Sequence, residues 1–381
     1  MVEEATFPQE RGVSVLAQRK SSFWVRLFAD PSWQAWAAKM PIIGRFVRRD
    51  GEAIFDILAG FCHSQVIFCL VELGIFNVLR DEEQTISKIA DDCGCSEDDL
   101  QLLIDGAVAL GLVKSSGAYL ALTRRGAAVA GAPGLQEIIR HNIVLYRDLS
   151  DPLSVIRGAK DTELSHFWPY VFGASGQAQD QNLAQRYSQL MADTQQMVSA
   201  DTLEIVGGTQ GSWLDIGGGS GVFIAALAAF RGKADGLGIF DLPAVENSAR
   251  NFLSTHSNLE AVKFHPGSFR DDSLPKGYQN ISLIRVLYDH DASTVSKLLQ
   301  DIFDILPASG RIFISEPMKG EERPQRAGDI YFALYCRAMK TGTVRKPSEI
   351  NALLEHVGFV DIKVYKSTRP FITTVIAARK A

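Results

Sequence analysis

The chain has 381 residues, of which 46% are hydrophobic and 22% charged, and its formal net charge is −5. A chain of this length exceeds the size at which one hydrophobic core usually divides, so we expect more than one domain. The negative charge argues against a nucleic-acid partner, and five scattered cysteines indicate a reducing compartment. The longest apolar stretch, Val66 to Phe76, is interrupted by Glu72 and is too short to predict a membrane span.

Residues 1–50 predict an extension in which aromatic and basic side chains interleave at near-helical spacing. Such a segment can pack on a partner subunit, which is what we expect, or lie on a membrane surface, which is the alternative. The side chains concerned are Phe23, Trp24, Phe28, Trp33, Trp36 and Phe46, with Arg26, Lys39, Arg45, Arg48 and Arg49.

Residues 51–135 have the pattern of a helical domain that ends in a winged helix. A long apolar helix is expected from Ile54 to Leu79, then a short helix at 85–91 and another at 96–110 that Ser96 caps. Strands at 112–114 and 118–122 flank a Ser-Ser-Gly turn and form a hairpin.

A winged helix is also typical of transcription regulators, so a non-catalytic regulator is an alternative from another class. However, the helix at 96–110 carries four acidic residues and no lysine or arginine, so DNA phosphates would repel it. We interpret this part as a dimerisation domain and expect a homodimer, because the apolar helix from Ile54 needs a partner to cover it.

A helical connector at 136–206 leads to an alternating α/β domain at 207–381. Strands near 212–216, 237–241, 261–265, 281–287 and 310–315 alternate with helical segments, which predicts an α/β fold with a doubly wound, mostly parallel sheet. Strands near 360–365 and 372–377 complete the sheet, the last one antiparallel. In such sheets, ligands bind at the carboxyl ends of the strands.

The run from Asp215 to Gly221 reads D-x-G-x-G-x-G directly after a short apolar strand. A dinucleotide fingerprint would need glycine where Val222 stands, and a P-loop would need Gly-Lys-Ser/Thr. The spacing instead resembles that of class I methyltransferases, which bind S-adenosylmethionine (SAM). In this interpretation Gly217, Gly219 and Gly221 let the backbone approach the ligand, Asp215 faces its positive charge, and Asp241, at the end of the next strand, accepts its ribose hydroxyls.

Further motifs follow in an order similar to that of the family that includes plant caffeate and bacterial polyketide O-methyltransferases. They are Phe240 to Pro243, His265 to Phe269, Arg285 to Asp291, Ser315 to Pro317 and Glu355 to Phe359. Five stretches further resemble the carotenoid 1-hydroxyl O-methyltransferases of purple phototrophs: 285–291, 315–318, 327–332, 339–342 and 369–373.

This resemblance covers residues 50 to 380 and implies a class I methyltransferase, Rossmann-like fold with an N-terminal winged-helix dimerisation domain. It also implies a SAM-dependent enzyme without a metal, which releases S-adenosylhomocysteine, and a hydrophobic acyclic hydroxycarotenoid as substrate. The implied location is cytoplasmic, with contact to the cytoplasmic face of the photosynthetic membrane as an alternative. A bacteriochlorophyllide C-methyltransferase is the alternative within the same fold.

The chain departs from the larger family at the catalytic base. The family's histidine position is Tyr288, its tryptophan position is His290, the first of its two glutamates is Glu316, and the second falls on Val344. A tertiary alcohol is too weak an acid for a side chain to ionise it, so we expect positioning to dominate and the proton to leave late. We expect His290 to accept the proton, directly or through water, Tyr288 to orient the hydroxyl and Glu316 to orient these groups. The alternative for His290 is that it only packs where the family has tryptophan.

The resemblance also predicts contacts with the cofactor and substrate. Ser268 stands where the family often has an acid, and it would hold the adenine together with Phe269. Arg285 would reach the cofactor, with pairing to an acid as the alternative. The substrate channel would be lined by two groups of side chains, with ordinary core packing as the alternative for each: Tyr187 and Met191 on the connector, and Phe332, Tyr335 and Met339 farther along.

Overall fold

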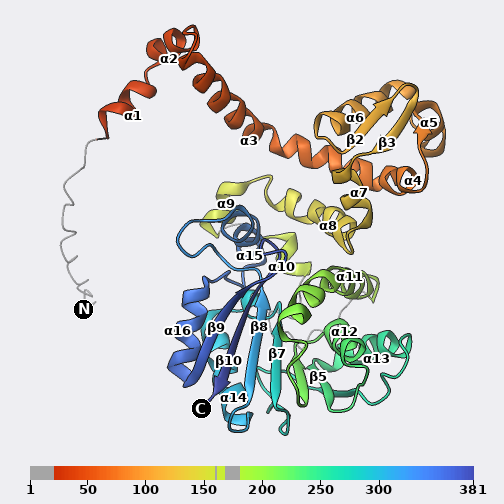
Figure 1. Ribbon diagram of the computed structural model, residues 1–381, viewed down its shortest axis with the longest axis vertical. Coiled ribbons are helices and arrows are strands. Elements are labelled where there is room, and N and C mark those ends of the chain that lie inside the picture. Colours follow the sequence, from red (N-terminus) through yellow and green to blue (C-terminus); the bar gives the residue numbers. More distant parts are fainter. Residues whose placement is uncertain (1–20, 159–160, 168–180) are drawn as a thin grey trace, which may run out of the picture. The chain divides into compact units, whose positions relative to one another are not determined.

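The structure is a computed structural model that describes residues 21–158, 161–167 and 181–381, with the side chains of Phe167 and 181–191 excepted. The chain divides between Val66 and Ile67 into two units, shown in Figure 1. The first unit contains α1 (Phe23–Phe28), α2 (Pro31–Ala38) and most of α3 (Ile43–Glu72). The domain boundaries expected after residues 50, 135 and 206 stay a prediction.

The second unit begins with the winged-helix part, whose three-stranded antiparallel sheet has the order β1-β3-β2. Ser96 caps α6 by accepting a hydrogen bond from the Asp99 backbone N–H at 3.1 Å, as predicted. The elements are α4 (Ile75–Asp81), β1 (Gln84–Thr85), α5 (Ile86–Cys93), α6 (Glu97–Ala109), β2 (Val113–Ser116), β3 (Tyr119–Leu122) and α7 (Arg124–Gly131).

One expected helix is wrong in its extent. The sequence pattern predicts a single helix from Ile54 to Leu79, but α3 ends at Glu72 and α4 begins after Gly74. Gly74 has a φ of 69°, a left-handed conformation that stops a helix and that glycine adopts without strain. The apolar periodicity continues across this break, which is why the pattern alone does not reveal it.

Between this part and the sheet, the described residues contain α8 (Leu135–Asp148), α9 (Pro152–Arg157), α10 (Glu163–Phe167) and α11 (Gln181–Val206). The remaining helical elements are α12 (Val222–Arg231), η1 (Pro243–Val245), α13 (Glu246–Ser254), η2 (Leu287–Asp289), α14 (Ala292–Ile305), η3 (Arg326–Phe332), α15 (Ala333–Met339) and α16 (Pro347–Val357).

A seven-stranded sheet with the order β6-β5-β4-β7-β8-β10-β9 forms the centre of the second unit (Figure 1). The first five strands in this order are parallel, and β10 is antiparallel to both of its neighbours, which confirms the predicted sheet. The strands are β4 (Trp213–Ile216), β5 (Leu237–Asp241), β6 (Lys263–Pro266), β7 (Asn280–Ile284), β8 (Arg311–Glu316), β9 (Phe359–Lys366) and β10 (Thr374–Lys380).

Helices cover both faces of this sheet because its strands are apolar on both sides. On one face, Leu214, Ile281 and Leu283 pack with side chains of α14 and α16. On the other face, Trp213 and Phe313 pack with side chains of α11 and α12. The two hydrophobic layers fix the carboxyl ends of β4, β5, β7 and β8 at one edge of the sheet.

The strand β7 is shorter than predicted, and this difference shapes the site. It ends at Ile284 instead of residue 287 because Arg285 takes a left-handed conformation with φ of 59°. The Arg285 backbone N–H still donates to the Ser315 carbonyl at 2.8 Å, after which the chain turns into η2. The positive φ of a non-glycine residue ends the pleat and redirects the following three residues.

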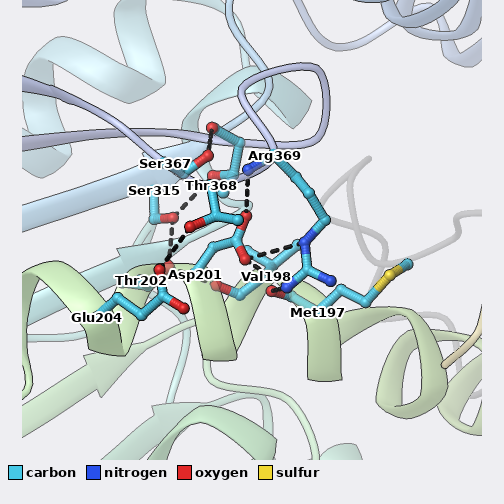
Figure 2. Close-up of polar contacts among 10 residues, drawn as sticks. Met197, Val198, Asp201, Thr202, Glu204, Ser315, Ser367, Thr368 and Arg369 are labelled. Carbon is cyan, nitrogen blue, oxygen red and sulfur yellow. Dashed lines mark hydrogen bonds and ion pairs between the residues drawn. The ribbon is translucent and has the colours of Figure 1, made fainter. Parts of the chain in front are cut away.

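Polar contacts attach α11 to the sheet (Figure 2). The Asp201 carboxylate is fully buried and accepts hydrogen bonds from the Arg369 backbone N–H at 2.9 Å and from Arg369 Nε at 3.0 Å. Beside this pair, the Thr202 and Ser315 hydroxyls lie 2.6 Å apart, and Ser315 Oγ lies 2.8 Å from Thr373 Oγ1. The connector helix is therefore held on β8 and on the loop between β9 and β10.

We expect Arg369→Met to lower the free energy of unfolding by about 3 kcal/mol, because it leaves the buried Asp201 carboxylate without its charged partner. Urea unfolding monitored by tryptophan fluorescence measures this change. The matched control is Arg379→Met, which removes the partner of the exposed Asp361 and should cost less than about 1 kcal/mol. Equal losses in the two variants would contradict the assigned role of the Asp201 pair.

Candidate functional site

The glycine-rich loop follows β4 and has three glycines in conformations with positive φ. Gly217, Gly219 and Gly221 have φ values of 70°, 56° and 87°. A Cβ atom at Gly217 would lie 2.9 Å from Val286 Cγ2, whereas a Cβ at Gly219 would meet nothing within 4 Å. The loop therefore packs tightly on its inner side and leaves space beside Gly219 where a ligand can approach the backbone.

Two carboxylates lie beneath this loop. Asp215 Oδ1 accepts a hydrogen bond from Ser282 Oγ at 2.6 Å, whereas Asp215 Oδ2 is buried and has no hydrogen-bond partner among the described residues. Asp241 accepts from the backbone N–H groups of Gly219 and Leu242, each at 2.7 Å. Burial raises the pKa of Asp215 to about 7 and also raises the pKa of Asp241. A buried acid beside a half-buried one fits a ligand that carries positive charge.

The turn η2 is fixed from two sides. Glu316 at the end of β8 is fully buried, and its Oε2 accepts from the backbone N–H groups of Leu287 at 2.9 Å and Tyr288 at 3.2 Å. Arg345 donates to the carbonyls of Leu287 at 2.8 Å and His290 at 3.0 Å. Burial raises the pKa of Glu316 to about 7. These contacts hold the η2 backbone rigidly at the carboxyl edge of the sheet.

Tyr288 is buried within this turn. It packs with Cys336 and Val344, and the Phe332 ring meets it edge-on at 6.3 Å between centroids. Burial raises the pKa of Tyr288 well above its usual value, although the adjacent Arg285 opposes this shift. Val344, the predicted position of the family's second glutamate, supplies an apolar contact to Tyr288.

His290 faces a different set of neighbours. Its Nδ1 accepts from Arg270 Nη2 at 3.0 Å, and its ring meets Phe269 edge-on at 5.1 Å between centroids. Burial lowers the pKa of His290 to about 4, and the Arg270 charge adds to this effect. The imidazole is therefore neutral near pH 7, and because Nδ1 accepts from Arg270, its proton is on Nε2.

The other predicted cofactor residues lie in two places. Ser268 is in the loop after β6, where its backbone N–H donates to Asp272 at 2.9 Å, and Phe269 packs on the core beside His290. Arg285 follows β7 directly. Its Nη1 donates to Thr194 Oγ1 on α11 at 2.8 Å, and its guanidinium interacts with Tyr288.

The predicted substrate residues also lie in different places. Phe332 lies beside Tyr288, whereas Met339 is 1% exposed and packs with Tyr335 among side chains of α8, α9 and α10. The Tyr335 hydroxyl lies 2.7 Å from His141 Nε2 on α8. Tyr187 and Met191 lie on α11, but their side chains are outside the described part of the structure. The buried Met339 fits the core-packing alternative, and the substrate role of all five residues stays a prediction.

Several side chains at the site are missing from the expectations of the sequence analysis. Ser282, Arg345 and Thr194 contact predicted residues but lie far from them in sequence, so no local pattern reveals them. Asp289 is different, because it lies inside the Arg285 to Asp291 motif and its Oδ1 is buried without a hydrogen-bond partner among the described residues. An acid two residues after a predicted strand is a pattern that can indicate such a residue.

Two parts of the chain match known protein families. Residues 146–360 match the O-methyltransferase domain, which is more than half of the chain, and residues 55–129 match the O-methyltransferase dimerisation domain.

The chain belongs to the O-methyltransferase family.

Among curated members of this family, a demethylspheroidene O-methyltransferase of Rhodobacter capsulatus is 41% identical over 374 residues, which cover 98% of this chain and 93% of that protein. The protein of the same name from Cereibacter sphaeroides is 41% identical, with 94% of each chain covered. These two relatives confirm the predicted family. The match of residues 55–129 to the O-methyltransferase dimerisation domain confirms the predicted dimerisation domain.

The fold of this O-methyltransferase family member is shared with solved structures. Human N-acetylserotonin methyltransferase, in complex with SAM, superposes with a TM-score of 0.73 at 23% identity and covers 87% of this chain and 98% of its own. The pyocyanin biosynthetic protein PhzM superposes with a TM-score of 0.74 at 18% identity, covering 87% of this chain and 99% of its own. This similarity confirms the predicted fold class.

Proposed function

We propose that this chain transfers a methyl group from SAM to the 1-hydroxyl of an acyclic hydroxycarotenoid such as demethylspheroidene or hydroxyneurosporene. The observation that carries the proposal is the 41% identity, over 98% of the chain, with an enzyme named for demethylspheroidene. The surroundings of Tyr288 support it, because the position of the family's histidine base has a buried tyrosine packed with Cys336, Val344 and Phe332. This apolar side of Tyr288 suits a hydrophobic alcohol, and no histidine stands at this position to ionise a phenol.

The loop after β4 fits SAM in charge and in shape. When bound, SAM supplies an electrophilic methyl group on a positively charged sulfur. The unpartnered Asp215 Oδ2 would face the positively charged part of the ligand, and the open side of Gly219 would admit the ligand next to the backbone. Asp241 would accept the ribose hydroxyls with the lone pairs that its two backbone contacts leave free. Ser268 and Phe269 would border the adenine.

A positioning mechanism follows from these residues. Glu316 and Arg345 hold η2, so that Tyr288 keeps one orientation beside the substrate hydroxyl. Holding the hydroxyl oxygen in line with the methyl carbon removes much of the entropic barrier to a reaction between two bound molecules. The neutral His290 contributes to the wall formed with Phe269.

The test of this function is incubation with SAM and a 1-hydroxycarotenoid in lipid vesicles, followed by mass spectrometry of the pigment. We expect the mass of one added methyl group and an unchanged absorption spectrum, since O-methylation leaves the polyene intact. A phenolic substrate of the caffeate type serves as the control and should not be methylated. Methylation of the phenol without methylation of the carotenoid, or C-methylation of a bacteriochlorophyllide, would contradict the proposal.

The dimerisation domain supports a homodimer. Its match begins at residue 55, within α3, where Phe55, Ile57, Leu58 and Phe61 are exposed. Among the described residues, α3 is the one helix long and apolar enough to cross a membrane, judged by length and composition alone. Because the dimerisation match covers the second part of α3, we propose that this apolar surface contacts a second subunit instead of lipid.

For the arm that precedes this match, we propose contact with an anionic membrane surface on the cytoplasmic side. Residues 21–50 contain five basic and two acidic residues, although the whole chain has a net charge of −5. Exposed aromatic side chains accompany the basic ones, a combination typical of segments at a membrane interface. They are Phe23, Trp24, Phe28, Trp36 and Phe46. A hydrophobic polyene substrate would reach the enzyme from such a surface.

Vesicle flotation tests this contact. We expect the protein to float with anionic vesicles, to bind neutral ones less, and to lose binding as salt increases. The double variant Trp24→Ser/Trp36→Ser should bind at least about tenfold more weakly, because two buried aromatic rings are lost from the interface. Phe230→Ser on α12, which also removes an exposed aromatic side chain, is the matched control. A wild-type protein that stays unbound would instead favour packing of the arm on the partner subunit.

A further inference from the structure

Asp289 is a buried acid at the site that the positioning mechanism leaves without a role. It ends η2 at the carboxyl edge of the sheet, one residue after Tyr288. The residue as a whole is half-buried, but its Oδ1 is shielded from solvent and has no hydrogen-bond partner among the described residues. Buried acceptors are normally paired in native structures, so an exception at a site of this kind calls for a chemical explanation.

Charged and titratable groups from three elements surround this carboxylate. Arg285 and Tyr288 lie on the same stretch of chain, Glu316 comes from β8 and Cys336 comes from α15. Burial raises the pKa of Asp289 to about 8, and the Glu316 charge adds to this, whereas Arg285 and Tyr288 oppose it. The carboxylate form is therefore accessible in the neutral to mildly alkaline range.

The two neighbouring side chains are less able to accept a proton. His290 has its Nδ1 lone pair directed at Arg270, and its Nε2 carries a proton. Tyr288 would have to be a phenolate, but burial raises its pKa well above the usual value. Asp289 Oδ1 is thus the acceptor atom in this turn with a lone pair that no described residue occupies.

We propose that Asp289 is the catalytic residue that accepts the proton of the substrate hydroxyl, an inference that rests on the proposed function. As the alcohol oxygen bonds to the methyl carbon, the carbon–sulfur bond breaks and its electron pair stays on sulfur. The O–H bond breaks late, and its proton passes to Asp289 Oδ1. The products are an ether, a neutral thioether and a protonated carboxyl group. The carboxylate also stabilises the positive charge that grows on the oxygen before the proton leaves. Arg285 and Tyr288 act as positioning residues that favour its ionised form.

The primary test is Asp289→Asn, which keeps the shape of the side chain and removes the proton acceptor. We expect kcat to fall about 100-fold, in the range of general base catalysis, while the KM of the carotenoid and the affinity for S-adenosylhomocysteine stay close to wild type.

In the wild type, kcat should rise with pH, since the reaction needs the carboxylate, with a midpoint at or below about 8. Asp289→Asn should lose this dependence. Tyr288→Phe should move the midpoint to higher pH, because the hydroxyl that lowers the Asp289 pKa is gone.

Asp291→Asn is the matched control. Asp291 is exposed and caps α14 by accepting from the Thr294 backbone N–H at 2.8 Å, a contact that asparagine can also make. This variant should keep both kcat and its pH dependence. A loss of less than about threefold in Asp289→Asn, or a large loss in His290→Gln with Asp289→Asn unimpaired, would overturn the inference.

A second measurement separates failure of this inference from failure of the proposed function, since it needs no substrate. The folded-state pKa of Asp289 is raised above its unfolded value, so its ionisation makes the folded protein less stable as the pH rises toward about 8. Urea unfolding should therefore show that Asp289→Asn becomes more stable relative to wild type between about pH 5 and about pH 8. A difference that does not change with pH would overturn the inference, whichever alcohol the enzyme methylates. A wild type that methylates no hydroxycarotenoid, with this pH dependence present, would contradict the proposed function alone.

Discussion

Three acids whose carboxylate oxygens are buried without partners dominate the carboxyl edge of the sheet. Asp215 in β4, Asp289 after β7 and Glu316 at the end of β8 each have one such oxygen among the described residues. Burying a carboxylate without a partner is unfavourable, and burial raises the pKa of all three acids. A fold that keeps this arrangement must either protonate the acids or bring a positive charge to them, as Arg285 does for Asp289 and Arg345 for Glu316. A cationic methyl donor would supply such a charge to Asp215.

The same constraint explains how an alcohol can be methylated where the family's histidine base is missing. An early base would need a pKa close to that of the alcohol, which no side chain provides. A carboxylate placed beside the reacting oxygen needs no such match, because it accepts the proton only after the oxygen has become positively charged. The apolar neighbours of Tyr288, Val344 among them, then serve position, while Asp289 takes the proton.

Local chemistry made much of this fold predictable. The capped helix after Ser96 and the glycine loop after β4 depend on residues close in sequence, so their patterns were sufficient. The break at Gly74 and the early end of β7 at Arg285 were not predictable in the same way, because apolar periodicity continues through both positions. At the site, the sequence indicated His290 by its place in a motif. Its actual partner, Arg270, lies twenty residues away in sequence and is brought to it only by the packing of the loop after β6.

The central claim is that the buried Asp215 carboxylate is balanced by a positively charged ligand, and calorimetric titration with SAM near pH 7 tests it most directly. Measured in two buffers with different ionisation enthalpies, binding should release protons, because a positive charge lowers the pKa of Asp215 from about 7. Affinity should then increase from about pH 6 to about pH 7.5, and Asp215→Asn should remove most of the proton release. Binding that releases no protons and has the same affinity across this range would contradict the account.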